Sequence, residues 1–196
     1  MRAILLVLGA ALVCGAAQAR EGNTYQDELR IYTDDIALQC KAVTQQLEAF
    51  KVRSDPLTGY NLMDAVQSLC HCLPEKTAAF KSTLTPEELA RPVTAEDYVA
   101  RFNPAVIDKC AAEQMRHMYG DECHKRFRRS GIDAPAYCAC MKSVVDGYSD
   151  DTAAAISAAA SEYLPQAAEA EKNAQPAPVR PPVLEAYFQA DRDCKR

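Results

Sequence analysis

Apolar side chains recur every three or four residues along most of the chain, the spacing that places them on one face of a helix. The clearest stripe begins after Thr24, a residue type that caps helices, and continues to Phe50. A turn around Pro56 precedes a second helix near Asn61, which Pro74 is expected to kink or restart. The first stripe consists of Tyr25, Leu29, Tyr32, Ile36, Cys40, Val43, Leu47 and Phe50.

The second half of the chain follows the same plan. Thr94 begins a helix that Asn103–Pro104 is expected to break, and Asp133 begins another. A long Ala-rich helix is predicted from about residue 152 to residue 172, because alanine has the highest intrinsic helix propensity. A Pro-rich linker follows, and then a tail helix.

Short helices are predicted between these longer ones. Thr85, Pro86 and Glu88 form a capping box with proline at the first helical position. Asp121 is expected to cap a second short helix that continues to Arg129.

The spacing of the cysteines indicates an internal duplication. Cys70-His71-Cys72 aligns with Cys138-Ala139-Cys140 at an offset of 68 residues, and Cys40 aligns with Cys110 at an offset of 70. Thr24 and Thr94, with an aspartate three residues after each, share the second offset.

These patterns predict an all-α protein, a tandem duplication of a disulfide-stapled helical hairpin unit with about six to eight helices in all. The first Cys…Cys-x-Cys unit is expected at 20–92 and the second at 93–173. The linker is expected at 174–182 and the tail helix at 183–196.

Residues 1–19 have the form of a cleaved secretory signal peptide. Arg2 provides the positive start, an apolar run follows, and Ala17-Gln18-Ala19 fits a cleavage site after Ala19. The apolar run is too short to span a bilayer, and no later segment is apolar enough to do so. The style of the segment favours a bacterial protein that is periplasmic or secreted.

Export determines how the cysteines are interpreted. Cys14 leaves with the signal, and eight cysteines remain, an even number that predicts disulfides in an oxidising compartment. Cys40 is expected to pair with Cys70 or Cys72, which lie level with it in an antiparallel hairpin. By equivalence, Cys110 is expected to pair with Cys138 or Cys140, and Cys123 with Cys194. The remaining member of each Cys-x-Cys pair would bridge the two units.

An alternative interpretation is a metal site. Cysteine and histidine side chains are ligands for Zn²⁺ and Cu(I). Two cysteines at i and i+2 on a helix do not easily reach one ion, and export favours oxidation. The default prediction is therefore no metal and no cofactor, and the alternative ligands are Cys70, His71, Cys72, Cys138, Cys140 and His124.

Signs of catalysis are few. The chain has three histidines and contains no nucleophile elbow, zinc-protease motif or phosphate-binding loop. A thiol–disulfide or hydrolytic enzyme is the least favoured function. The sequence has neither a Cys-x-x-Cys motif nor a thioredoxin-like pattern of strands. The leading prediction is a non-catalytic binding, interaction or structural module of the bacterial envelope, with a protein partner and an unspecified oligomeric state.

Charge limits the range of partners. The formal net charge of −5, more negative still without Arg2, argues against nucleic acid as a general partner. One concentrated basic run stands out in this acidic chain. It is a candidate surface for an acidic partner, although such runs are commonly only solvated helix faces. Its members are Lys125, Arg126, Arg128 and Arg129.

Overall fold

The protein was analysed as a computed structural model, which describes residues 22–49, 62–120, 123–126 and 131–196. Every regular element in these ranges is a helix, which confirms the predicted all-α class. The elements are α2 (Tyr25–Ala49), α3 (Leu62–Ser82), α4 (Pro86–Ala90), α5 (Ala95–Phe102), the π-helix η1 (Asn103–Ile107), α6 (Asp108–Met118), α7 (Cys123–Arg126), α8 (Ala134–Asp146), α9 (Asp150–Lys172) and α10 (Pro182–Cys194).

The predicted helix starts at Thr85, Thr94 and Asp133 are confirmed. The Thr85 side chain accepts from the Glu88 N–H, and the Glu88 side chain accepts from the Thr85 N–H, the reciprocal pattern of a capping box. At the starts of α5 and α8 the cap has one hydrogen bond: the Thr94 side chain accepts from the Asp97 N–H, and the Asp133 side chain accepts from the Ala136 N–H. Each cap satisfies a backbone donor that the first helical turn leaves free, so local sequence determines these boundaries.

The two prolines that were expected to interrupt helices, Pro74 and Pro104, do not end them. Pro74 lies inside α3, which runs on without interruption. At Asn103–Pro104 the expected break is wrong, because the chain remains helical through η1. Pro104 has no N–H to donate, and the helix widens locally to the π pattern, in which the Asp108 N–H bonds to the Asn103 carbonyl. Residues 95–118 therefore form one helical path.

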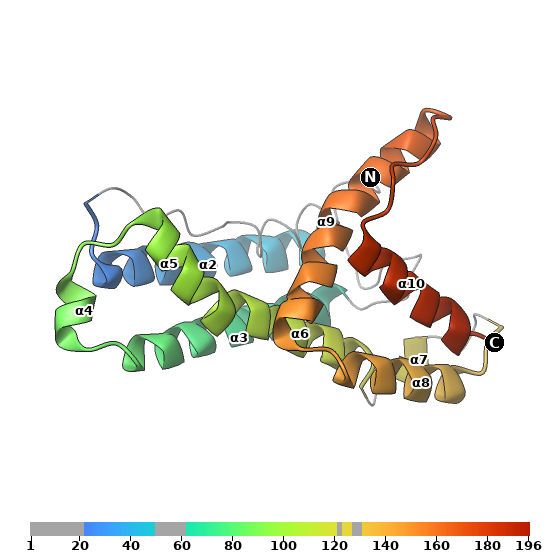
Figure 1. Ribbon diagram of the computed structural model, residues 1–196, viewed down its shortest axis with the longest axis horizontal. Helices are drawn as coiled ribbons and strands as arrows, with labels where there is room; N and C mark the ends of the chain where they lie inside the picture. The colour runs from blue at the N-terminus through green and yellow to red at the C-terminus, as the bar shows by residue number, and fades with distance from the viewer. Residues whose placement is uncertain (1–21, 50–61, 121–122, 127–130) are drawn as a thin grey trace.

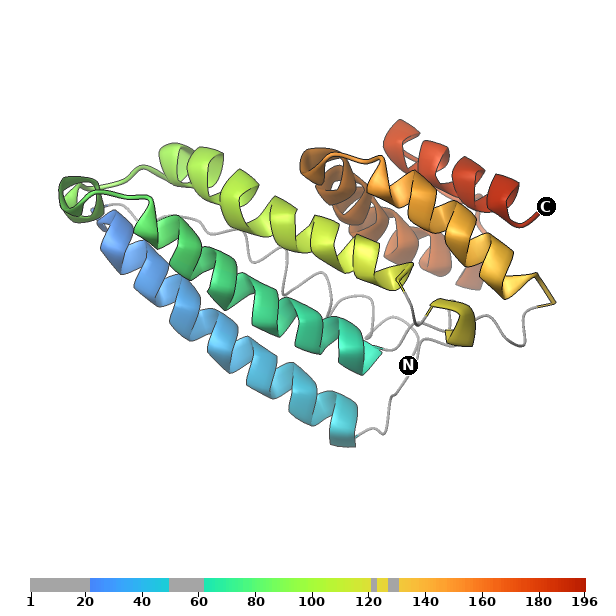
Figure 2. The ribbon, with the colours of Figure 1, turned by 90° about the horizontal axis from the view of Figure 1, so that it is seen from below.

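The first core lies between α2, α3 and the 95–118 path, which run side by side in Figure 2. Aromatic rings dominate it: Tyr32 meets Phe102 edge-on with centroids 4.7 Å apart, and Phe102 stacks on Tyr98 at 4.9 Å. Phe102 also meets Phe80 of α3 edge-on, at 5.7 Å. These contacts join all three helices through a single side chain, and Phe102 is fully buried.

The second core lies at the other end of the elongated molecule, where α6, α8, α9 and α10 converge (Figure 1). Met141 of α8 and Leu184 of α10 are almost completely buried, and Ile156 of α9 packs with them. Residues of α6 beyond Cys110 belong to this core, whereas Cys110 itself belongs to the first. The division between these two cores therefore falls within α6.

Four disulfides connect the helices. Cys40 bonds to Cys70 and Cys72 bonds to Cys110, with Cα–Cα distances of 5.7 Å in both. Cys123 bonds to Cys138 at a Cα–Cα distance of 5.9 Å, and Cys140 bonds to Cys194 at 5.6 Å. The first two bonds link helices around the first core, which we call the first bundle. The last two link helices around the second core, which we call the second bundle. No disulfide joins one set of four cysteines to the other.

The Cys40–Cys70 bond is one of the two pairings expected for Cys40. The expected pairing of Cys110 with Cys138 or Cys140 is wrong, because the 95–118 path packs against α3 and sets Cys110 level with Cys72. The two predicted units are bridged, but through Cys110 rather than through the second Cys-x-Cys pair. The repeat therefore does not determine the connectivity.

The expected Cys123–Cys194 bond is also wrong. The short helix α7 packs against α8, which places Cys123 beside Cys138 in the first turns of α8. The tail helix α10 packs on α8 from another side and reaches Cys140 instead. The expected signal peptide at 1–19, the turn at Pro56 and the start at Asp121 lie outside the described residues.

These bonds predict the products of tryptic digestion under non-reducing conditions. Peptides 31–41, 54–76 and 110–116 should remain linked as one product, and peptides 117–125, 130–142 and 193–195 as another. Mass spectrometry of the oxidised, exported protein checks this. A product that joins 110–116 to 130–142 would contradict the connectivity.

Candidate functional site

The two Cys-x-Cys pairs share one arrangement. Cys72 is buried and bonds towards the first core, whereas Cys70 is half-buried and bonds to α2. Cys138 is buried and bonds to α7, whereas Cys140 is exposed and bonds to the tail helix. Residues two apart on a helix point in nearly opposite directions, roughly 200° apart, so each pair attaches its helix to two different neighbours.

The alternative metal ligands do not come together as a site. Their four cysteine sulfurs all lie in disulfides and are therefore not thiolates, the form that binds metal. The His71 imidazole is 85% exposed and lies 3.6 Å from a Glu75 carboxylate oxygen. His124 lies half-buried in α7. Within the described ranges, no three His, Cys, Asp or Glu side chains are grouped to hold a metal ion.

The predicted basic patch cannot be placed in full. Lys125 and Arg126 belong to α7, but their side chains are outside the described part of the structure. Arg128 and Arg129 lie outside the described residues altogether. The patch stays a prediction from the sequence.

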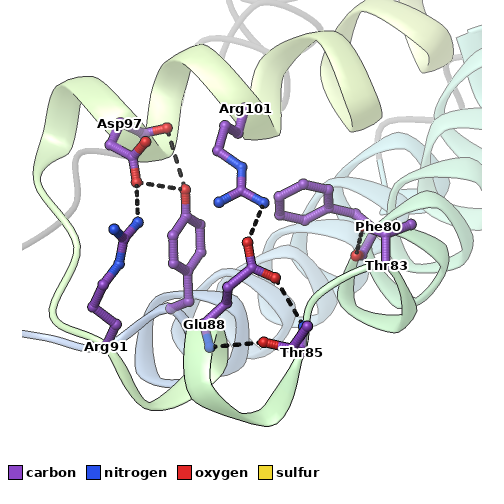
Figure 3. A network of polar contacts seen from close by, with 8 residues as sticks. Phe80, Thr83, Thr85, Glu88, Arg91, Asp97 and Arg101 are labelled. Carbon is purple, nitrogen blue, oxygen red and sulfur yellow. Dashed lines mark hydrogen bonds and ion pairs between the residues drawn. The ribbon is translucent and has the colours of Figure 1, made fainter.

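A polar network joins the beginnings of α2 and α5 to α4 (Figure 3). The buried Tyr25 hydroxyl donates to an Asp97 carboxylate oxygen at 3.0 Å, and Arg91 forms an ion pair with the same oxygen at 3.2 Å. Arg101 lies over the Tyr25 ring, 5.3 Å from its centroid, and pairs with Glu88 at 3.1 Å. The network connects three helices by charge-assisted contacts around one tyrosine.

Burial raises the pKa of Tyr25 to about 12, and the hydrogen bond to the Asp97 carboxylate adds to the rise. The Glu88 pKa is held low by the capping hydrogen bond from the Thr85 N–H and by Arg101. Both shifts favour the protonation states that make the observed contacts at neutral pH. The network therefore stabilises the contacts among α2, α4 and α5, and we call it the Tyr25–Asp97 joint.

A second tyrosine group holds the tail helix. The hydroxyls of Tyr119, directly after α6, and Tyr187 in α10 are hydrogen-bonded to each other. Tyr137 of α8 donates to Asp191 at 2.6 Å, and Lys195 pairs with the other oxygen of that carboxylate at 2.6 Å. Burial raises the pKa of all three tyrosines, so the hydroxyls stay protonated and able to donate.

The surface has a groove of about 280 Å³ between α2 and α3. Short side chains line it. The Thr33 hydroxyl donates to the Leu29 carbonyl and the Thr77 hydroxyl donates to the Leu73 carbonyl, both at 2.7 Å, so neither side chain extends into the groove. The buried side chain of Leu29 lies at its floor. The lining residues are Leu29, Arg30, Thr33, Asp34, Pro74, Thr77, Ala78 and Lys81.

Charged residues line the groove, and an exposed apolar residue lies farther along α2. Arg30 and Lys81 lie at the groove, and Arg30 has only a long ion pair of 3.7 Å with Asp34. Among the described residues, no ion pair involves Lys81. Leu38, one helical turn beyond Asp34, is 68% exposed. The sequence did not predict the groove, although Pro74, Thr77 and Ala78 at helical spacing could have suggested a face of short side chains on this helix.

Comparison with known proteins identifies no relative. No family model matches the chain, and neither a curated protein nor a solved structure is similar to it. None of the described helices is both long and apolar enough to cross a membrane.

Replacing Tyr25 with phenylalanine should lower the free energy of unfolding by about 1 kcal/mol, the typical net value of one hydrogen bond. Tyr32 is the matched control, because its buried hydroxyl has no hydrogen-bond partner among the described residues. Tyr32→Phe should leave stability unchanged or raise it. Urea unfolding followed by circular dichroism measures both. Equal losses in the two variants would contradict a role for the Asp97 bond.

Alkaline pH should weaken the fold. A tyrosine whose folded pKa lies above its ordinary value of 10.0 contributes stability that is present below pH 10 and is lost as pH rises towards about 12. The thermal midpoint is therefore expected to decline only above pH 10. The decline should be smaller in Tyr25→Phe. A midpoint that declines equally in that variant would exclude a contribution from Tyr25.

Proposed function

We propose that this protein is an exported, non-catalytic binding module of the bacterial envelope, which presents a rigid helical surface to a protein partner. The observation that supports this most directly is the covalent frame: all eight cysteines that follow the expected cleavage site lie in disulfides. A fixed surface loses little conformational freedom on binding, which favours affinity.

The same observation supports the compartment. Disulfides form and persist in oxidising environments such as the periplasm and the cell exterior. The signal-like segment at 1–19 agrees with export to either place.

The groove between α2 and α3 is the surface proposed for binding. Buried Leu29 and the short side chains that line the groove leave room for side chains of a partner segment, and the exposed Leu38 lies one helical turn farther along α2. Lys81 places a positive charge at one end of the groove on a protein that is acidic as a whole, whereas Arg30 is paired with Asp34, which also lines the groove. The partner is therefore proposed to be a polypeptide segment with a carboxylate that faces this end.

Site-specific photo-crosslinking in the cells that export the protein tests the proposal. A photoreactive residue at Thr33 or Ala78 should give one discrete cross-linked product of higher mass. The same residue at Glu96 of α5 or Ala168 of α9, both exposed and away from the groove, should give none. Products of equal yield from all four positions, or from no position, would refute the groove as the binding surface.

A charge variant sharpens this experiment. Lys81→Glu should reduce the yield from Thr33 about fivefold, since one exposed ion pair is worth up to roughly 1 kcal/mol. Lys142→Glu is the control, because Lys142 lies on α8 and lines no part of the groove. An equal reduction in both variants would indicate that only the overall charge matters.

A further inference from the structure

The four disulfides differ in their access to solvent. Both partners of the Cys72–Cys110 bond are buried, at 5% and 1% exposure, as are both partners of Cys123–Cys138, at 1% and 7%. Cys40 and Cys70 are half-buried. In the fourth bond Cys140 is exposed and Cys194 is half-buried. A reductant must reach a sulfur atom to attack it, so Cys140–Cys194 is the bond most open to attack in the folded protein.

This bond attaches the end of the tail helix α10 to α8. Cys194 is the last residue of α10, and the partner cysteine lies on α8 (Figure 1). The first half of α10 is held separately, because Leu184 is buried in the second core and Tyr187 bonds to Tyr119. Loss of the disulfide would therefore leave the fold in place. It would free mainly the end of the helix, which the Tyr137–Asp191 hydrogen bond and the Lys195 ammonium over the Tyr137 ring still hold to α8.

The geometry of α8 also protects the neighbouring bond. A thiol at Cys140 lies only two residues from the Cys123–Cys138 disulfide, but the two side chains point in nearly opposite directions on the helix. Cys138 points into the core and Cys140 points to solvent. The free thiol cannot reach the buried sulfur to exchange with it. Once opened, the pair can close again only on itself.

We infer that Cys140–Cys194 is a reversible redox clasp on the tail helix, opened by a dithiol reductant while the other three disulfides stay closed. A thiolate of the reductant attacks the Cys140 sulfur, forms a mixed disulfide and releases the Cys194 thiolate. The second thiol of the reductant then attacks its own bonded sulfur and releases Cys140. The reductant gives up two electrons and two protons to become a disulfide, and the protein gains two thiols.

The consequence is a change in the surface of the second bundle. With the clasp open, the end of α10 can move away from α8 and uncover the edge of the core around Tyr137. With the clasp closed, that edge is covered. The oxidised and reduced proteins thus differ in one local surface, independently of the α2–α3 groove.

Limited reduction by dithiothreitol under native conditions, followed by alkylation and peptide mapping, tests the inference. The first two thiols should map to Cys140 and Cys194, with the helical circular dichroism unchanged. Cys72 and Cys123 should react at least roughly tenfold more slowly, because their bonds are reached only by local or global opening. First labelling at any other pair, or labelling spread over all eight cysteines, would overturn the inference.

Hydrogen exchange supplies the second measurement. In the reduced protein, amides near the end of α10 should exchange faster, and reoxidation should restore the original rate. The double variant Cys140→Ser, Cys194→Ser should show the faster exchange without reductant. The matched control Cys40→Ser, Cys70→Ser should keep slow exchange in α10. Unchanged exchange on reduction would show that the bond opens without acting as a clasp.

Discussion

The helical path from Ala95 to Met118 is the constraint on which the architecture depends, because it takes part in both cores. Phe102 and Val106 are completely buried in the first core, and Met115 is buried in the second. Two bundles that share one stiff helix have a fixed mutual placement without a large interface between them. The π segment at Pro104 preserves this continuity where a break would have uncoupled the bundles.

The disulfides add stability where the cores are small. In the chain-entropy model, loops of 15 to 54 residues each contribute about 3–4 kcal/mol. A whole domain is typically stable by about 5–15 kcal/mol, so each bond is a large share of the total. Their division into two separate sets of four cysteines follows the two cores. Each set fixes helices around one core, and the shared helix joins the two sets without a disulfide between them.

Local features of the sequence predicted local structure well. Thr85, Thr94 and Asp133 begin helices because each cap depends only on residues within one turn. The tail helix α10 has no side-chain cap hydrogen bond, and it was predicted from the helical spacing of its residues instead. The disulfide partners of Cys110 and Cys123 could not be predicted in this way. They depend on which helices pack together, and a repeat in the sequence does not determine that packing.

The groove and the Tyr25–Asp97 joint show the same limit. Tyr25 and Asp97 lie far apart in the chain, and no local pattern links a tyrosine to a carboxylate at that distance. The groove is lined by Thr33 of α2 and by Pro74 and Ala78 of α3, so it depends on which two helices pack together. Short side chains on one helix could suggest a shallow face from the sequence. The facing helix, and hence the groove, is known only from the packing.

The Cys-x-Cys spacing explains why one protein combines fixed and accessible bonds. On a helix that already packs against a core, two positions two residues apart cannot both face inward. One cysteine must bond within the core, as Cys72 and Cys138 do, and the other must bond nearer the surface, as Cys70 and Cys140 do. The inner bonds are shielded by the packing that they reinforce. The outer bonds attach the second half of α2 to α3 and the end of α10 to α8. Beyond Cys40, Val43 and Leu47 are still buried against α3, whereas Cys194 is the last residue of α10, so only the second outer bond lies at a helix end.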